Sequence, residues 1–272
     1  MLHFEKYHGT GNDFIIFDFR VASLGEALDE EASALARSVC HRHMGIGADG
    51  MMLVRTSKTA DVKMDFYNAD GSRAPMCGNG IRCFAKYVHN HHIVEGQTFK
   101  VETLAGIMTI KLYMDESNTT QVTVNMGFPI LDLLSQDLKI NIDRKNFDLN
   151  TLVMGTDHCV IFTEGMTTDE IEKYGKIIEG HAHFPDKINV NFVEVIDDQH
   201  ITVSTFERGV GRTLSCGTGS AASAVISHLK GYTQSRVHVE VPGGNLLIQI
   251  REDGVHMTGP AALICKGDYY NA

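Results

Sequence analysis

The sequence predicts an α+β fold made of two similar halves, and three observations lead to this prediction. The chain has 272 residues, nearly twice the commonest domain size of about 100 to 150 residues. Segments with strand and helix periodicity are mixed without a steady strand-helix alternation, which argues against a doubly wound parallel sheet. Four short landmarks also recur in the same order in both halves. We therefore expect two related domains.

The spacing of apolar residues places the elements of the first half. Apolar residues at helical spacing predict helices over residues 24–39 and 81–89. Short apolar or alternating segments predict strands, and a strand-turn-strand unit is expected with its turn at Ala105-Gly106. The predicted strands are residues 14–17, 51–54 and 62–67, and the strand-turn-strand unit covers residues 97–112.

The four landmarks indicate an internal duplication. They are a Gly-x-Asp segment before an apolar run, a trio that ends nine residues before a cysteine, a Cys-Gly-x-Gly turn, and a Val-Glu segment 24 or 23 residues after that cysteine. Coincidence among common glycine turns would not reproduce both order and spacing. In the first and second halves the landmarks lie at residues 11–17 and 155–162, 66–68 and 205–207, 77–80 and 216–219, and 101–106 and 239–244.

The composition excludes several classes of protein. It is 43% hydrophobic and 21% charged with only 5 Pro, which argues against disorder and collagen-like structure. The net charge of −10 argues against nucleic acid or an anionic membrane surface as a partner. No apolar run approaches the roughly 18 residues of a membrane span, and the first residues lack a signal-peptide layout. We expect a cytoplasmic protein.

The six cysteines are expected to be reduced, because no signal peptide and no Cys-x-x-Cys pair is present. Two of them, Cys77 and Cys216, each precede a Gly-x-Gly and a segment of helical character, so each should begin a helix. We expect these two to be reactive and the other four to pack as small hydrophobic residues. Those four are Cys40, Cys83, Cys159 and Cys265.

A helix N-terminus carries unpaired N–H groups and a partial positive charge, so it stabilises anions. We expect the Cys77 and Cys216 thiols to lose their protons readily. The backbone amides that follow them can hold a carboxylate. If the two turns face each other, a carbon beside that carboxylate lies between two sulfurs, one removing a proton and the other delivering one. The arrangement suits inversion of a stereocentre, and its amides would stabilise the charge that develops.

Other interpretations of the same residues remain open. A single Cys-Gly-x-Gly turn often holds only a buried small residue. A nucleophilic thiol needs one cysteine and an orienting histidine such as His158, but this leaves the second turn unexplained. The histidines at 41, 43, 89, 91 and 92 are expected to be solvated rather than metal ligands. Residues 45–50 form a G-x-G-x-x-G string, but it follows a helix and precedes a strand, so we interpret it as a turn.

The sequence resembles the diaminopimelate epimerase family from Phe4 to Pro260. The resemblance rests on five motifs that are specific in combination. They are His8-Gly-Thr-Gly-Asn-Asp-Phe14, Phe66-Tyr-Asn-Ala-Asp-Gly-Ser72, Met76-Cys-Gly-Asn-Gly-Ile-Arg-Cys83, Phe206-Glu-Arg-Gly209 and Ser215-Cys-Gly-Thr-Gly219.

The resemblance implies two pseudo-symmetric domains, each a curved mixed or antiparallel sheet wrapped around a central helix. The expected domains are residues 1–118 with a C-terminal strand at 263–272, and residues 119–262. The implied reaction interconverts LL- and meso-diaminopimelate in lysine biosynthesis, without a cofactor or metal. A small-molecule amino acid substrate and a possible homodimer are the implied partners, with no nucleic acid and no membrane.

The resemblance also implies roles for individual residues. Cys77 and Cys216 would be the acid–base pair, with His158 and Glu207 supporting the thiols. Arg208 can pair bidentately with a carboxylate and Glu207 can pair with an ammonium group. The implied substrate-binding residues are Asn12, Asn68, Gly78, Asn79, Asn189, Glu207, Arg208, Gly217 and Thr218.

The chain departs from the family pattern in two places. Gly155-Thr156-Asp157-His158 stands where the family usually reads Gly-Asn-Pro-His, and Arg212 lies where many members carry an acid. An acidic Asp157 near the substrate favours a cationic or imidazole side chain. The alternative substrate is therefore histidine or a basic amino acid, and more distant alternatives are a thiol hydrolase or a non-catalytic amino acid binding protein.

Overall fold

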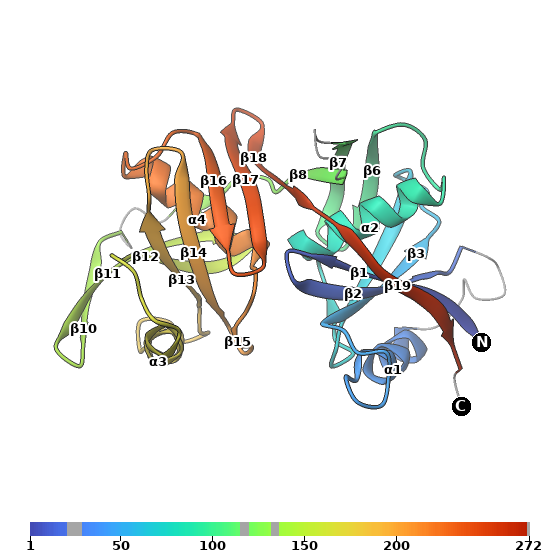
Figure 1. Ribbon diagram of the computed structural model, residues 1–272, viewed down its shortest axis with the longest axis horizontal. Helices are drawn as coiled ribbons and strands as arrows, with labels where there is room; N and C mark the ends of the chain where they lie inside the picture. The colour runs from blue at the N-terminus through green and yellow to red at the C-terminus, as the bar shows by residue number, and fades with distance from the viewer. Residues whose placement is uncertain (21–28, 115–119, 132–135, 271–272) are drawn as a thin grey trace. The chain divides into compact units, whose positions relative to one another are not determined.

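The computed structural model describes residues 1–20, 29–114, 120–131 and 136–270 (Figure 1). The chain forms two compact units, each with its own strands and helices. Unit 1 is Met1–Val124 with Gly259–Ala272, and unit 2 is Asn125–Thr258. The predicted fold class, α+β with two pseudo-symmetric domains, is confirmed. The predicted boundary between residues 118 and 119 lies outside the described residues.

Within the described residues, unit 1 has two helices and most of its strands in the first part of the chain, and one strand, β19, near residue 270. These elements are β1 (Leu2–Gly9), β2 (Asn12–Asp18), α1 (Asp29–Cys40), β3 (Gly50–Arg55), β4 (Val62–Asn68), β5 (Arg73–Ala74), α2 (Gly78–Asn90), β6 (Thr98–Thr103), β7 (Gly106–Met114), β8 (Thr120–Asn125) and β19 (Ala262–Tyr269). β19 pairs antiparallel with β1.

Unit 2 is built from one continuous stretch of chain. Its elements are β9 (Ile130–Leu131), β10 (Leu138–Ile142), β11 (Lys145–Met154), β12 (Thr156–Phe162), α3 (Thr168–Glu179), β13 (Asn189–Val195), β14 (His200–Glu207), β15 (Gly211–Arg212), α4 (Gly217–Leu229), β16 (Arg236–Val241), β17 (Gly244–Arg251) and most of β18 (Gly254–Pro260).

Strand pairing repeats from one unit to the other, which confirms the internal duplication. In unit 1, β2 pairs parallel with β3, β3 antiparallel with β4, β4 parallel with β6, and β6 antiparallel with β7. In unit 2, β12, β13, β14, β16 and β17 pair in the same senses and order. Helices α1 and α3 each connect the parallel pair, and α2 and α4 each precede the final hairpin.

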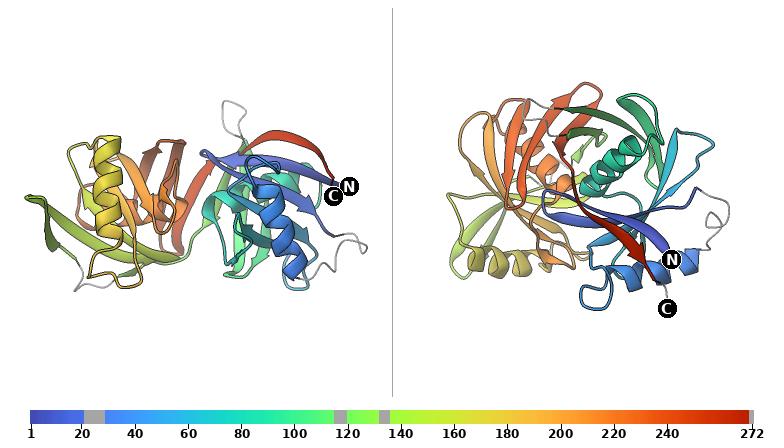
Figure 2. Two further views of the ribbon diagram at one scale, coloured as in Figure 1. Left: turned by 90° about the horizontal axis from the view of Figure 1, so that it is seen from below. Right: turned by 45° about the vertical axis from the view of Figure 1, so that its right-hand side comes forward.

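One helix in each unit is buried among the strands, α2 in unit 1 and α4 in unit 2 (Figures 1 and 2). Nearly all of α4 is buried because its residues are small or apolar, and its alanines pack with strand valines and isoleucines. Helix α2 buries larger side chains such as Ile81 and Phe84. Burial of apolar area at about 25 cal/mol per Å² stabilises this arrangement. Each buried helix begins directly after one of the two reactive-cysteine candidates.

Most of the predicted elements match the structure. The strands predicted at 14–17, 51–54 and 62–67 are the centres of β2, β3 and β4, and the hairpin predicted at 97–112 is β6 and β7. The helix predicted at 24–39 matches α1, although residues 24–28 lie outside the described residues. Among the described residues, no helix has both the length and the apolar character to cross a bilayer.

One cysteine prediction is wrong. Cys40, Cys83 and Cys159 are buried as expected, but Cys265 is exposed. Cys265 lies on β19, where most side chains are exposed or only partly buried. The strand joins its sheet through the ladder with β1, and Tyr269 packs against the core of unit 1.

Candidate functional site

Cys77 and Cys216 occupy the same structural position in their two units. Each is the N-cap of a buried helix, in an extended backbone conformation, with φ −133° and ψ 123° at Cys77 and φ −118° and ψ 111° at Cys216. The sulfur accepts a hydrogen bond from the third backbone N–H of the helix, 3.4 Å from Gly80 N in α2 and 3.4 Å from Gly219 N in α4. Ser, Thr, Asp or Asn usually fills this position. A sulfur here lies in the positive potential of the helix end, where its anionic form is favoured.

The glycines at the third helix position allow this close approach. A Cβ at Gly80 would lie 3.3 Å from Cys77 Cβ, and one at Gly219 would lie 3.3 Å from Cys216 Cβ. The constraint is tighter in unit 2, where the Gly219 Cβ would also lie 2.3 Å from Asn191 Oδ1. The Cys-Gly-x-Gly spacing therefore has a steric reason in both halves.

In unit 1, the turn between β1 and β2 brings Asn12 to the cysteine. Thr10 and Gly11 both have positive φ, 52° and 89°, so the chain reverses tightly just before Asn12. Cys77 Sγ donates to Asn12 Oδ1 at 3.7 Å. The other end of the Asn12 amide donates to Asp49 Oδ2 at 2.5 Å. Asn12 is one of the substrate-binding residues implied by the family resemblance, whereas Asp49 was not predicted.

Arg82 is a second residue that the sequence analysis missed. It lies in α2 with 0% exposure. Its guanidinium donates to Asn79 Oδ1 at 2.9 Å, to Thr10 Oγ1 at 3.1 Å and to the carbonyl of Pro260 at 3.3 Å. Burial lowers the pKa of Arg82 to about 10, so the group stays charged at neutral pH. It therefore joins the first turn of α2, the β1–β2 turn and the end of β18, just before β19, around one buried cation.

Asn68 lies at the end of β4, within the turn that leads to β5. Its Nδ2 donates to Ser72 Oγ at 2.9 Å, and Ser72 Oγ in turn donates to Asp70 Oδ1 at 2.6 Å. The side chain of Asn68 is therefore held by its own turn.

In unit 2, a hydrogen-bond network fixes the direction of the Thr156 hydroxyl. Asn189 Oδ1 accepts from the backbone N–H of Arg208 at 3.0 Å, so its Nδ2 is the group that donates to Thr156 Oγ1 at 3.2 Å. Asn191 Oδ1 accepts from Thr205 Oγ1 at 3.0 Å, so its Nδ2 donates to His158 Nδ1 at 3.2 Å.

His158 Nε2 therefore carries the ring hydrogen and donates to Thr156 Oγ1 at 3.2 Å. Both lone pairs of the Thr156 hydroxyl are then occupied, one by His158 and one by Asn189. Because Thr156 is exposed, its hydroxyl hydrogen is directed to a partner outside this network. The hydroxyl is thus a hydrogen-bond donor to whatever binds there.

His158 is a neutral residue at physiological pH. It has 0% exposure, and burial together with the charge of Arg208 lowers its pKa to about 3. Its described contacts are with Thr156 and Asn191.

The end of β14 carries Glu207 and the residue after it, Arg208. Glu207 Oε1 accepts from Thr213 Oγ1 at 2.7 Å. Arg208 Nη1 lies 3.7 Å from Asp157 Oδ2 and donates to the carbonyl of Asp186 at 3.4 Å. Both partners of the Arg208–Asp157 pair are partly exposed, so their attraction is screened by solvent.

The structure thus brings several of the predicted residues together within each unit. Asn12, Cys77, Gly78 and Asn79 lie around the start of α2 in unit 1. In unit 2, Thr218 Oγ1 lies 3.5 Å from Cys216 Sγ. The segment containing Thr156 and His158 is joined to Asn189, which contacts the backbone of Arg208.

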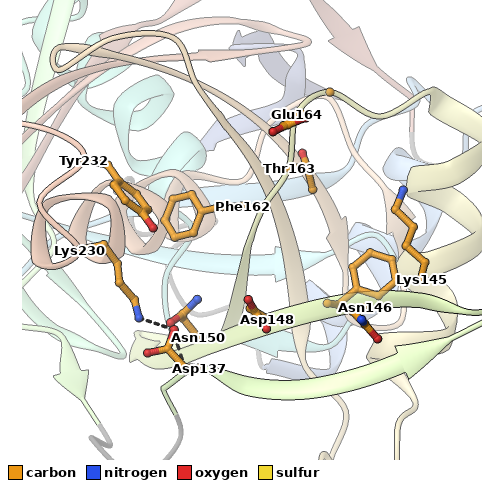
Figure 3. Close-up of a pocket in the computed structure, with 12 residues that line it drawn as sticks. Asp137, Lys145, Asn146, Asp148, Asn150, Phe162, Thr163, Glu164, Lys230 and Tyr232 are labelled. Atoms are coloured by element: carbon orange, nitrogen blue, oxygen red, sulfur yellow. Dashed lines mark hydrogen bonds and ion pairs between the residues drawn. The ribbon is translucent and has the colours of Figure 1, made fainter.

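A cavity of about 410 Å³ lies elsewhere in unit 2 (Figure 3). Lys230 donates to Asp137 Oδ1 at 2.6 Å on one side of it, and the rings of Phe162 and Tyr232 pack edge to face at 4.9 Å. The described residues that line this cavity include none of the predicted site residues. Those residues are Asp137, Lys145, Asn146, Phe147, Asp148, Asn150, Phe162, Thr163, Glu164, Gly165, Lys230 and Tyr232.

Comparisons with known proteins identify relatives across the whole chain. A family model described as diaminopimelate epimerase matches residues 4–131 and 151–264. The diaminopimelate epimerase of Alkaliphilus metalliredigens is 42% identical over 282 residues, covering 100% of this chain and 98% of that protein. The diaminopimelate epimerase of Clostridium perfringens is 41% identical over 281 residues, covering 98% and 99%.

Solved structures support the fold. A phenazine biosynthesis protein of the PhzF family from Bacillus anthracis has a TM-score of 0.75 at 15% identity, covering 99% of both chains. A probable proline racemase from Agrobacterium radiobacter has a TM-score of 0.73 at 15% identity, covering 99% of this chain and 93% of that one.

Proposed function

Because this chain belongs to the diaminopimelate epimerase family, we propose that it is an isomerase that interconverts LL- and meso-diaminopimelate. One structural observation supports the proposal above all others: a cysteine caps the buried helix of each unit, Cys77 on α2 and Cys216 on α4. A duplicated cysteine cap supplies two equivalent proton carriers, which is what inversion of an α-carbon requires.

In the proposed reaction, one cysteine thiolate removes the α-proton of the substrate and the other cysteine thiol donates its proton to the opposite face. The substrate is inverted, and the two sulfurs have exchanged protonation states. The reverse direction uses the same groups in exchanged roles. No cofactor takes part in the proposed mechanism, because the thiols and the substrate carboxylate account for every proton and charge.

We propose that the backbone amides of Gly78, Asn79, Gly217 and Thr218 hold the α-carboxylate. Removal of the α-proton increases the negative charge on that carboxylate. Amides at a helix N-terminus bind this charge more strongly as it develops, so they stabilise the transition state more than the bound substrate. Asn12 would act beside the reacting carbon, close to Cys77.

The distal amino acid head of the substrate is assigned to Asn68, Asn189, Glu207 and Arg208. Arg208 would pair with the distal carboxylate and Glu207 with the distal ammonium group. Thr156 adds a hydroxyl donor beside Asn189, in place of the asparagine usual in the family. His158 and Glu207 would support the thiols, with His158 acting as a neutral group because of its low pKa.

The remaining expectations belong to the same proposal. The catalytic domains would be residues 1–118 with 263–272, and residues 119–262, in a cytoplasmic enzyme that acts as a homodimer. Its partner would be the amino acid substrate, with no nucleic acid and no membrane.

A racemase of histidine or a basic amino acid is the second candidate. The observation that favours it is the position of Asp157, whose carboxylate lies 3.7 Å from Arg208 and competes with a substrate carboxylate for that guanidinium. A cationic substrate side chain would meet less opposition at Asp157 than a carboxylate would.

An exchange screen in deuterated water tests both candidates. LL-diaminopimelate, L-histidine, L-lysine and L-ornithine are incubated with the enzyme, and loss of each α-proton signal is followed by NMR. We expect exchange and inversion with diaminopimelate. Exchange confined to histidine would transfer the assignment to the second candidate, and no exchange with any amino acid would refute both. A thiol hydrolase would form a covalent intermediate without α-deuteration.

A further inference from the structure

We propose that Asp49 is a positioning residue that holds the Asn12 amide with its oxygen toward Cys77, so that Cys77 rests as a protonated thiol. The inference deepens the proposed function, since it says which of the two cysteines is the proton donor at rest. It also rests on the proposed function for the catalytic importance of Cys77. The contacts that support it lie entirely within unit 1.

The two ends of the Asn12 amide face different partners. Asn12 Nδ2 lies 2.5 Å from Asp49 Oδ2, and Asn12 Oδ1 lies 3.7 Å from Cys77 Sγ. A carboxylate only accepts hydrogen bonds, so it must face the NH₂ end of the amide. The oxygen end is then left for the sulfur, where it can accept only from a protonated thiol.

Asp49 is itself held firmly. Arg42 Nη2 donates to Asp49 Oδ1 at 2.6 Å, and the backbone N–H of Asp13 donates to Asp49 Oδ2 at 3.2 Å. The backbone N–H of Asp49 donates to the carbonyl of Asp13 at 2.9 Å. The carboxylate is thus fixed to the start of β2, the strand on which Asn12 lies.

The charges around Asp13, the neighbour of Asn12, keep the Asp13 carboxylate ionised. Arg42 Nη2 lies 2.8 Å from Asp13 Oδ1, and Lys6 Nζ lies 2.8 Å from Asp13 Oδ2. Although burial raises the pKa of Asp13, hydrogen bonds from Arg42 and Lys6 lower it to about 2. Lys6 also donates to the carbonyl of Gly47 at 2.6 Å, which ties β1 to the segment that contains Asp49.

The protonation of Cys77 reflects opposing influences. The N-terminus of α2 and the buried cation of Arg82 favour the thiolate. The Asn12 oxygen favours the thiol, as do the negative charges of Asp13 on β2 and Asp49 before β3. Cys83 on α2 also interacts with Cys77, and Lys6 and His8 on β1 contact Gly47 and Gly11, which lie close in sequence to Asp49 and Asn12. Without the fixed orientation of Asn12, its NH₂ end would be free to turn to the sulfur and strengthen the thiolate.

Unit 2 does not repeat this arrangement. The parallel ladder of unit 1 starts with Phe14 opposite Gly50, and that of unit 2 starts with His158 opposite Asn189. Phe14 therefore corresponds to His158, and Gly50 corresponds to Asn189. By that alignment Thr156 takes the place of Asn12, and Ile188 takes the place of Asp49. An isoleucine cannot accept a hydrogen bond, so Cys216 provides an internal control for the effect.

Thiol alkylation tests the inference without any substrate. The native enzyme is treated briefly with iodoacetamide across a series of pH values, and mass spectrometry follows the Cys77 and Cys216 peptides separately. We expect Asp49→Asn to lower the alkylation midpoint of Cys77 by about one pH unit, a tenfold gain in thiolate. The Cys216 midpoint should stay unchanged. Asp49→Glu keeps a carboxylate, which only accepts hydrogen bonds, so the Cys77 midpoint in this variant should stay closer to the native value.

Asp49→Asn can act on Cys77 in two ways, by releasing the Asn12 amide and by removing the negative charge of Asp49. Repeating the substitution in the Asn12→Ala variant separates these two effects. Asp49→Asn should lower the Cys77 midpoint much less in that background, because no amide remains to turn. An equal shift in both backgrounds, or no shift in either, would overturn the inference. Asn12→Ala alone leaves Asp49 intact and should also lower the alkylation midpoint of Cys77. If that midpoint stays the same or rises, the inference is contradicted. This test remains available even if Asp49→Asn does not fold.

Portions of the same preparations that have not met iodoacetamide are assayed for α-proton exchange. A Cys77 shift in a chain that exchanges no amino acid would uphold the role of Asp49 and refute the proposed function. If diaminopimelate exchanges its α-proton but the Cys77 midpoint does not shift, the proposed function is upheld and the role of Asp49 is refuted.

Discussion

Acid should destabilise this protein through His158, and the size of the effect follows from its burial. The pKa of His158 is lowered to about 3 in the folded chain, whereas an unfolded histidine titrates near 6.5. Between these values the unfolded chain binds a proton that the folded chain does not. The resulting stability is fully present above about pH 6.5 and is lost progressively as the pH falls toward 3.

The expected loss is about 1.4 kcal/mol for each pH unit in that window. From pH 7 to pH 4.5, His158 should therefore cost roughly 2 to 3 kcal/mol of unfolding free energy. This is a large share of the roughly 5 to 15 kcal/mol that stabilises a typical domain.

The assay compares the native chain with His158→Gln by urea unfolding at both pH values. Glutamine retains one acceptor and one donor for Asn191 and Thr156 but does not titrate. We expect the variant to be less stable at pH 7, through imperfect replacement of two buried hydrogen bonds. Between pH 7 and pH 4.5 the variant should lose less free energy of unfolding than the native chain, by roughly 2 to 3 kcal/mol. Equal losses in the two proteins would refute the reasoning, since exposed histidines are the same in both.

Three further predictions follow from the site. Cys77→Ala and Cys216→Ala should each lower diaminopimelate epimerisation by about 10² to 10⁴, the usual contribution of an acid–base group. NMR in deuterated water measures this, and full activity in either variant would contradict the two-thiol mechanism. Gly219→Ala should lower the melting temperature because its Cβ would lie 2.3 Å from a buried amide oxygen, whereas Gly180→Ala, whose nearest neighbour would lie at 3.9 Å, should not. Similar melting temperatures for the two would contradict the steric argument. Thr156→Val should raise the KM for diaminopimelate about tenfold through loss of one hydrogen bond to a charged group, while Thr156→Ser keeps the donor. Equal KM values would show that the hydroxyl does not contact substrate.

Local patterns predicted the elements and the cysteine positions because these depend on neighbours in sequence. Periodicity located β2, β3 and β4, and the Cys-Gly-x-Gly turns located the starts of α2 and α4. The duplication was visible because both halves repeat the same spacing. The fold class followed from these features together.

The missed residues depend on contacts between distant parts of the chain. Arg82 would be placed on a helix surface by its charge, yet partners 72 and 178 residues away, Thr10 and Pro260, allow it to be buried. Asp49 lies within the segment interpreted as a turn, and its role follows from Asn12, 37 residues earlier. The direction of the Thr156 hydroxyl depends on partners from two strands and cannot be obtained from its sequence neighbours.

The split composition of unit 1 has a consequence for synthesis on the ribosome. Unit 2 is one uninterrupted stretch, Asn125–Thr258, whereas unit 1 needs Gly259–Ala272 as well as its first part. The ladder between β1 and β19, and the carbonyl of Pro260 that accepts from Arg82, exist only after those last residues emerge. The half of the chain made first is thus completed only after unit 2 has been made, and the environment of Cys77 is finished only then.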